Sequence, residues 1–132
     1  MGCDIHAMIE KKGERWWINA GDPEIDRNYM LFAVLANVRN DGDIPYISEP
    51  KGVPDDCCPE FQAWCESWSG DGHSYTYVTL SELHTFDVKQ KENDMCNGIR
   101  SAWRTKLWRT LIATLEKQGK GDSVRLVFFF DN

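Results

Sequence analysis

The last ten residues, SVRLVFFFDN, restrict the possible folds more than any other part of this sequence. Every residue from Leu126 to Phe130 is apolar, so an extended strand would be apolar on both faces there. Such a strand needs cover on both sides, which is typical of a central strand in a sheet with helices packed against it. The sequence therefore predicts a buried C-terminal strand in a layered fold.

The N-terminal residues predict a hairpin. Residues 2–11 and 14–19 have strand character on either side of Lys12-Gly13, where the chain can turn back. A further strand is expected at YTYVTL, residues 75–80, because aromatic and β-branched residues favour strands.

Three longer segments have helical character. The stretch 26–40, DRNYMLFAVLANVRN, is apolar nearly all round, which predicts a deeply buried helix with Asp26 as its N-cap. A short helix is expected after Pro59, because proline suits the first helical position. The clearest amphipathic pattern covers 97–116, where apolar residues recur at steps of four. Ser81 opens a predicted helical turn, and residues 86–95 are expected to be solvated.

These elements predict a single α+β domain over residues 1–132. The sheet is expected to be antiparallel or mixed, with about four strands covered by about three helices. The fold would contain an N-terminal hairpin and a buried C-terminal strand. The irregular segment 41–58 is rich in Gly, Pro and Asp and is a candidate wall of a functional site, because long ordered loops usually serve function.

Composition and charge exclude several classes of protein. The net charge of −6 divides into −10 for residues 1–96 and +4 for 97–132, which disfavours a general DNA-binding coat. No stretch approaches the roughly 20 apolar residues that span a bilayer, and no leader sequence is recognisable. Five cysteines without a CxxC pair favour a reducing compartment over a disulfide framework. The sequence therefore predicts a cytoplasmic protein with no membrane partner.

The first predicted strand carries polar residues where apolar ones are expected. Alternation puts four side chains on one face: Asp4, His6, Met8 and Glu10. A carboxylate beside an imidazole can bind a divalent metal or act as a base with its orienting acid. The alternative is that this face of the hairpin meets solvent. Whether the final Asp131-Asn132 lies beside this face is left open by the sequence.

A second polar group follows a glycine-rich turn. In SGDGHSYTYVTL, three residues lie where a loop enters a strand: Asp71, His73 and Ser74. Rigid scaffolds often present reactive groups at such junctions. The alternative is a flexible turn with an incidental histidine. The third histidine, His84, is interpreted as a surface or structural residue.

Other polar residues suggest an anion site. They come from the two ends of the first predicted helix and from the ISEPKG loop: Arg27, Asn28, Arg39, Ser48, Glu49 and Lys51. Arginine binds phosphate or carboxylate bidentately, and a helix N-terminus helps to hold an anion. The alternative is ion pairing with the many local acids. The arginines of 97–116 are interpreted as a solvated face, and nucleic-acid binding is not favoured.

Short motifs follow one another in a recognisable order. They are CDIH at 3–6 with Glu10, RNY at 27–29, VRN at 38–40, ISEPKG at 47–52, PDD at 54–56, the Asp71 and His73-Ser74 group, and the closing 124–130. In these motifs most of the chain resembles a family of small uncharacterised proteins encoded mostly by bacteriophages and prophages. The resemblance implies a phage protein in the cytoplasm of a bacterial host. Small phage proteins of this size often act in counter-defence against a host nucleotide signal, and by analogy the same role is expected here. Some relatives carry histidine where Met8 stands, so this chain is less suited to a three-ligand metal site on the first strand.

Together these features favour a small enzyme or enzyme-like protein with an anionic, nucleotide-like ligand. The expected reaction is hydrolysis of a phosphodiester or other phosphoryl bond, with four catalytic residues: Asp4, His6, Asp71 and His73. The cofactor is unknown, and a divalent metal would take Asp4, His6 and His73 as ligands. The ligand would contact Glu10, Arg27, Asn28, Arg39, Ser48, Glu49, Lys51 and Ser74. Two alternatives stay open: a non-catalytic protein that sequesters a host nucleotide signal, and an acidic inhibitor of a host protein.

Overall fold

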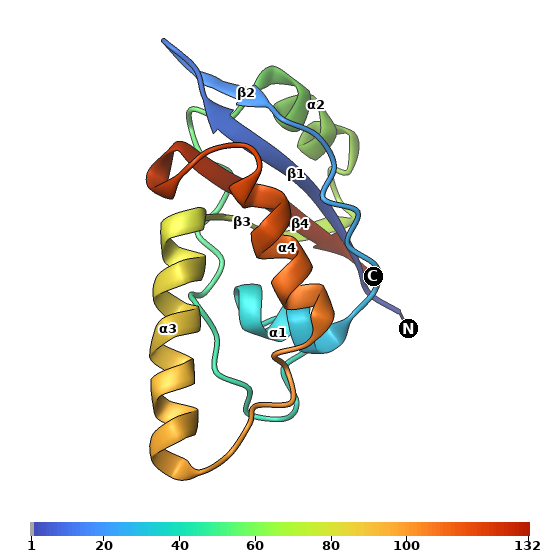
Figure 1. The fold of residues 1–132 in the computed structure, drawn as a ribbon. Helices are drawn as coiled ribbons and strands as arrows, with labels where there is room; N and C mark the ends of the chain where they lie inside the picture. Colours follow the sequence, from blue (N-terminus) through green and yellow to red (C-terminus); the bar gives the residue numbers. More distant parts are fainter. Residues whose placement is uncertain (1) are drawn as a thin grey trace.

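The computed structural model describes residues 2–132 as an antiparallel sheet of four strands, in the order β2-β1-β4-β3, with helices on both faces (Figure 1). The strands are β1 (Asp4–Lys12), β2 (Trp17–Asn19), β3 (Gly72–Thr79) and β4 (Val124–Asp131). The helices are α1 (Tyr29–Ala36), α2 (Pro59–Ser67), α3 (Leu80–Asn97) and α4 (Lys106–Glu116), and a 3-10 turn, η1 (Gly121–Ser123), precedes β4. The α+β class is confirmed, with four α-helices where the sequence predicted about three.

Strand β4 is the central strand that its sequence predicts. Residues 124–130 are all buried, and β4 pairs with β1 on one side and with β3 on the other. Because successive side chains of a strand point to opposite faces, β4 contributes to two separate cores. Phe128 and Phe130 belong to the larger core with residues of α1, α3 and α4, whereas Val127 and Phe129 pack with residues of α2. In Figure 1, α2 accordingly lies across the sheet from the other three helices.

The polar face of β1 is largely covered by α2. Odd-numbered residues such as Ala7 and Ile9 enter the larger core, and Met8 packs in the smaller core beneath α2. On the same face as Met8, the Glu10 side chain is completely buried, and only 19% of the His6 side chain is exposed. The alternation seen in the sequence is therefore real, but from His6 to Glu10 this face is not a solvent surface, and only Asp4 at the start of the strand is about half exposed.

Helix α1 is buried as its composition predicts, but its cap differs. The six residues from Leu31 to Ala36 are all buried. The N-cap is Asn28, whose Oδ1 accepts a hydrogen bond from the backbone N–H of Leu31 at 3.0 Å, so the prediction of Asp26 as the cap is wrong. Asn28 was expected to bind a ligand, and this bond gives its side chain a structural role instead.

The boundaries of α3 and α4 also differ from the prediction. The expected short turn at Ser81 is the start of an 18-residue helix, which begins with a capping box between Thr79 and Glu82. This helix ends at a left-handed Gly98, and Asp94 accepts hydrogen bonds from the backbone N–H and the hydroxyl of Ser101. The amphipathic helix therefore starts only at Lys106, and not at residue 97. No helix within residues 2–132 is both long enough and apolar enough to cross a membrane.

An ion pair in the smaller core connects distant parts of the chain. Glu10 Oε1 accepts a hydrogen bond of 2.7 Å from Arg125 Nε, and Glu10 Oε2 accepts one of 2.6 Å from the backbone N–H of Cys58, the residue just before α2. Arg125 also donates to Asp56, and its guanidinium lies 3.9 Å from the centre of the Trp17 ring. Glu10 was expected to contact a ligand, but both of its oxygens are occupied by these partners.

Removing the charge of Glu10 should destabilise the whole fold. In Glu10→Gln the buried Arg125 loses its buried counter-charge and keeps only the exposed Asp56, and breaking a buried pair costs about 3 kcal/mol or more of unfolding free energy. Urea unfolding measures the loss, and Glu14→Gln on the exposed hairpin is the control with the same change of charge. Adding Arg125→Met to Glu10→Gln should recover part of the stability, because no unpaired charge is then left in the core. Equal stability of the two single variants would contradict this role.

Candidate functional site

His6 lies on the α2 side of the sheet, among aromatic rings. Its imidazole stacks on Phe129 with ring centroids 5.0 Å apart and lies 4.5 Å from the Trp68 ring and 5.5 Å from the Trp64 ring. His6 Nε2 is hydrogen-bonded to the Asp131 carboxylate at the end of β4. Because antiparallel pairing places Asp131 opposite Asp4, this carboxylate reaches the first-strand histidine across the ladder. The sequence left that position open, and the structure places Asp131 at the site.

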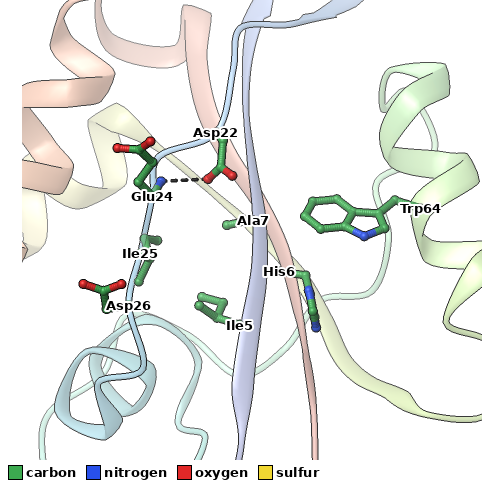
Figure 2. A pocket seen from close by; sticks show the side chains of 8 residues that line it. All are labelled: Ile5, His6, Ala7, Asp22, Glu24, Ile25, Asp26 and Trp64. Carbon is green, nitrogen blue, oxygen red and sulfur yellow. Dashed lines mark hydrogen bonds between the residues drawn. The ribbon is translucent and has the colours of Figure 1, made fainter.

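A cleft of about 500 Å³ opens next to His6, and we call it the His6 cleft (Figure 2). It is lined by Ile5, His6, Ala7, Asp22, Glu24, Ile25, Asp26 and Trp64. A second cavity of about 320 Å³ shares three of these residues, Ala7, Asp22 and Trp64. The His6 cleft therefore lies between the outer edge of β1, the segment 22–26 and helix α2.

The cleft exists because the pairing of β1 with the following chain stops early. Ile9 still exchanges backbone hydrogen bonds with Ala20 and Gly21, at 2.7 and 2.8 Å. Gly21 then adopts a φ of 112°, which glycine tolerates, and the chain leaves the edge of β1. It returns where the Arg27 guanidinium binds the Asp4 carboxylate through two hydrogen bonds of 2.8 and 2.9 Å. Residues 22–26 thus form an arch beside the strand.

Backbone groups of β1 face this arch. Within an antiparallel strand, alternate residues direct their N–H and C=O groups to opposite neighbours. Ile9 bonds to the β2 side, so Ala7 and Ile5 must point their N–H and C=O groups to the same side, where the arch has separated from the strand. No backbone bond joins either residue to the arch. The His6 cleft therefore offers both donors and acceptors along the edge of β1.

The charged side chains of the lining are carboxylates, apart from the titratable His6. Figure 2 shows the Asp22 carboxylate directed toward β1, whereas the carboxylates of Glu24 and Asp26 lie on the far side of the arch. Asp22 also accepts a hydrogen bond of 2.7 Å from the backbone N–H of Glu24, which holds it in place. A cleft of this kind attracts positive charge.

Arg27, the arginine expected to hold an anion near His6, is engaged in the closure of the arch. Both of its contacting nitrogens bind Asp4, and this hydrogen bonding lowers the pKa of the Asp4 carboxyl. Asp4 and Arg27 are each about half exposed. The pair therefore belongs to the rim of the site, and neither residue lines the cleft.

The other expected ligand contacts lie in other parts of the structure. Lys51 has its ammonium 3.6 Å from Glu82 and 4.1 Å from the centre of the Tyr77 ring. The guanidinium of Arg39 lies 5.3 Å from the centre of the Tyr29 ring, and Glu49 accepts a hydrogen bond from the Asn37 side chain. Neither these residues nor Ser48 line the His6 cleft. The predicted cationic groups therefore do not gather around a common ligand there.

His6 and His73 do not share a pocket. His73 pairs with Phe130 and stacks on its ring, while His6 pairs with Phe129 and stacks on that ring. Consecutive residues of β4 point to opposite faces, so the sheet separates the two imidazoles. His73 instead contacts Ser74 and Asn132. Asp71 is exposed at the turn before β3, with its backbone N–H bonded to the Trp68 carbonyl.

The same separation removes the expected metal site. Asp4, His6 and His73 were the proposed ligands, and the two histidines lie on different faces of the sheet. In the part of the chain that the structure describes, no three side chains of His, Cys, Asp or Glu come together closely enough to hold a metal ion.

Sequence reasoning missed several residues of the site. Asp22 lies in a loop, and Trp64 and Trp68 come from α2 and the turn after it, so no pattern within β1 connects them to His6. The high tryptophan content indicated that the protein has an aromatic surface, but it did not indicate where that surface lies. We also compared the chain with known proteins: no family model, no curated protein and no solved structure matches it. The resemblance to phage proteins therefore stays a prediction.

The cysteines beneath α2 should be chemically inert. Burial raises the pKa of the Cys58 and Cys65 thiols from 9.0 to about 12, so their thiolate fraction at neutral pH falls roughly a thousandfold. We expect a chromogenic aromatic disulfide to react quickly with one thiol of the folded protein, the exposed Cys96, because burial also raises the pKa of the buried Cys3 and the half-buried Cys57. Cys96→Ser should abolish the fast phase, and urea should release all five thiols. Fast labelling of Cys58 or Cys65 in the folded state would contradict this prediction.

Proposed function

We propose that this protein acts by binding, and that the His6 cleft receives a positively charged side chain, arginine or lysine, from a partner protein. The observation that carries the proposal is the Asp22 carboxylate, which is directed toward β1 in a lining that contains no lysine or arginine among the described residues. Of the functions that the sequence left open, this proposal is nearest to the acidic inhibitor of a host protein. If the resemblance to phage proteins holds, the partner is a protein of the bacterial host.

The cleft offers three complementary contacts for a guanidinium or ammonium group. Asp22 is directed toward β1 and can accept a charge-assisted hydrogen bond (Figure 2). The carbonyl groups of Ile5 and Ala7, which no backbone hydrogen bond joins to the arch, are further acceptors along the strand edge. The indole of Trp64 supplies an aromatic wall, against which a cation is attracted by the ring quadrupole.

Long-range electrostatics support the same kind of partner. Residues 1–96, which supply the whole lining of the cleft, carry a net charge of −10. A field of this sign accelerates the approach of a basic surface and slows that of an anion. A phosphate group in the cleft would also lie against Asp22 without a lysine or arginine in the lining. The nucleotide-like ligand expected from the sequence is therefore less well supported than a cation.

Hydrolysis at this cleft is the second candidate, favoured by the contact between His6 and Asp131. A carboxylate on Nε2 orients the imidazole and leaves Nδ1 as the acceptor of a proton, the arrangement of a general base. The lining contains no hydroxyl or thiol side chain, so the nucleophile would be water.

Binding of a cationic side chain can be tested with an arginine-rich peptide. Calorimetry at low and physiological ionic strength should detect binding, and a peptide with citrulline in place of arginine should not bind, because citrulline has the same shape without the charge. Asp22→Asn should weaken binding about tenfold, since a hydrogen bond to a charged group contributes about 1.5 kcal/mol or more. Asp122→Asn, an exposed position outside the cleft, is the control with the same change of net charge.

Three outcomes would contradict the proposal. Equal binding of the citrulline peptide would exclude recognition of charge. Equal weakening of binding by Asp22→Asn and Asp122→Asn would indicate a general electrostatic attraction to the acidic protein and no specific site in the cleft. Turnover of nucleotides, followed by chromatography and lost in His6→Ala but not in His84→Ala, would favour the hydrolytic candidate. His84 is a suitable control because it lies on α3 with Glu116 as its partner.

A further inference from the structure

A second polar group lies across the sheet from the His6 cleft. His73 Nδ1 is 3.0 Å from the Ser74 hydroxyl oxygen, and His73 Nε2 is hydrogen-bonded to the amide oxygen Oδ1 of Asn132. Ser74 and His73 are partly exposed, and Asn132 is exposed. The three side chains thus form a chain of contacts that solvent and small molecules can reach.

The partners of His73 determine which ring nitrogen carries the proton. An amide oxygen can only accept a hydrogen bond, so His73 Nε2 must be the protonated nitrogen in the neutral imidazole. His73 Nδ1 is then an acceptor, and the Ser74 hydroxyl donates its hydrogen to it. The ring is further held by stacking on Phe130, with centroids 6.2 Å apart and planes inclined by 27°.

The contact between His73 and Ser74 depends on an unusual backbone. Consecutive residues in a regular strand point to opposite faces, so neighbouring side chains normally cannot meet. Here the register of β3 against β4 shifts between His73 and Thr76, and Ser74 has a φ of 56°. A left-handed conformation is unfavourable for a residue with a Cβ, and it brings the serine hydroxyl beside the histidine. Bulges of this kind often redirect a side chain next to a functional site.

We propose that Ser74 is an activated nucleophile, with His73 as its general base and Asn132 as the residue that positions the base. The substrate class is an activated acyl or phosphoryl group that carries a leaving group. Ser74 Oγ forms a bond to the electrophilic carbon or phosphorus while its proton passes to His73 Nδ1. The bond to the leaving group breaks, and the protonated imidazole returns the proton to that group. This site does not depend on the function proposed for the His6 cleft.

The proposal is tested with an alkyl fluorophosphonate on the full chain, read by mass spectrometry. In this reaction an O–P bond forms at Ser74, the P–F bond breaks, and hydrogen fluoride is released. We expect one adduct per chain, mapped to Ser74, and unchanged labelling in the matched control Ser69→Ala. His73→Gln should slow labelling by about a hundredfold or more.

Two further variants separate activation from folding. Ser74→Gly should fold at least as well as the parent, because glycine adopts a positive φ without strain, and it should take up no probe. Asn132→Ala should slow labelling and change its dependence on pH, whereas Asn132→Asp keeps an acceptor oxygen and should restore labelling. The proposal is overturned if the parent chain is not labelled, if another serine is labelled, or if His73→Gln reacts at the parental rate. Asp22→Asn should leave labelling unchanged, which keeps this test independent of the cleft.

Discussion

The buried ion pair between Glu10 and Arg125 is the interaction on which the rest of the structure depends. Glu10 is completely buried and Arg125 is 4% exposed, so each charge needs the other. The pair joins the first strand to the last, and the second oxygen of Glu10 holds the backbone just before α2. Helix α2 is thereby anchored over the face of β1 that carries His6. Trp64 covers the cleft because this anchor places its helix there.

The even-numbered positions of β1 have three different roles. Glu10 organises the smaller core, His6 contacts the aromatic rings and Asp131, and Asp4 binds the Arg27 guanidinium that closes the arch. The arch leaves the edge of β1 at Gly21 and returns at Arg27, so an open strand edge is framed at both ends. A cleft forms because the chain separates from the strand over a few residues while Ile9 and Asp4 hold its two ends.

The sheet divides the polar chemistry of the molecule into two regions. Phe129 and Phe130 are neighbours in β4, yet one ring supports His6 and the other supports His73. The two terminal residues of the chain divide in the same way, with Asp131 on His6 and Asn132 on His73. One region is an acidic cleft with aromatic walls, and the other is a serine and histidine pair at a bulge. Their different chemistry supports a separate proposal for each.

Local sequence patterns determined four features of the fold: the hairpin, the start of α2 at Pro59, the buried character of α1 and the central position of β4. These features could be predicted because neighbouring residues encode the alternation of a strand and the burial of a helix. The cap at Asn28 and the limits of α3 and α4 needed hydrogen bonds, such as the one from Ser101 to Asp94, that a pattern does not specify. The sequence also indicated that His6 and His73 were unusual. Only the tertiary structure decided that Glu10 is a buried structural residue and that the two histidines are apart. The physical reason is that long-range contacts decide on which face of the sheet a side chain lies and which residue it contacts. These contacts are the strand pairing, the β-bulge and the helix packing, and they join residues far apart in the chain.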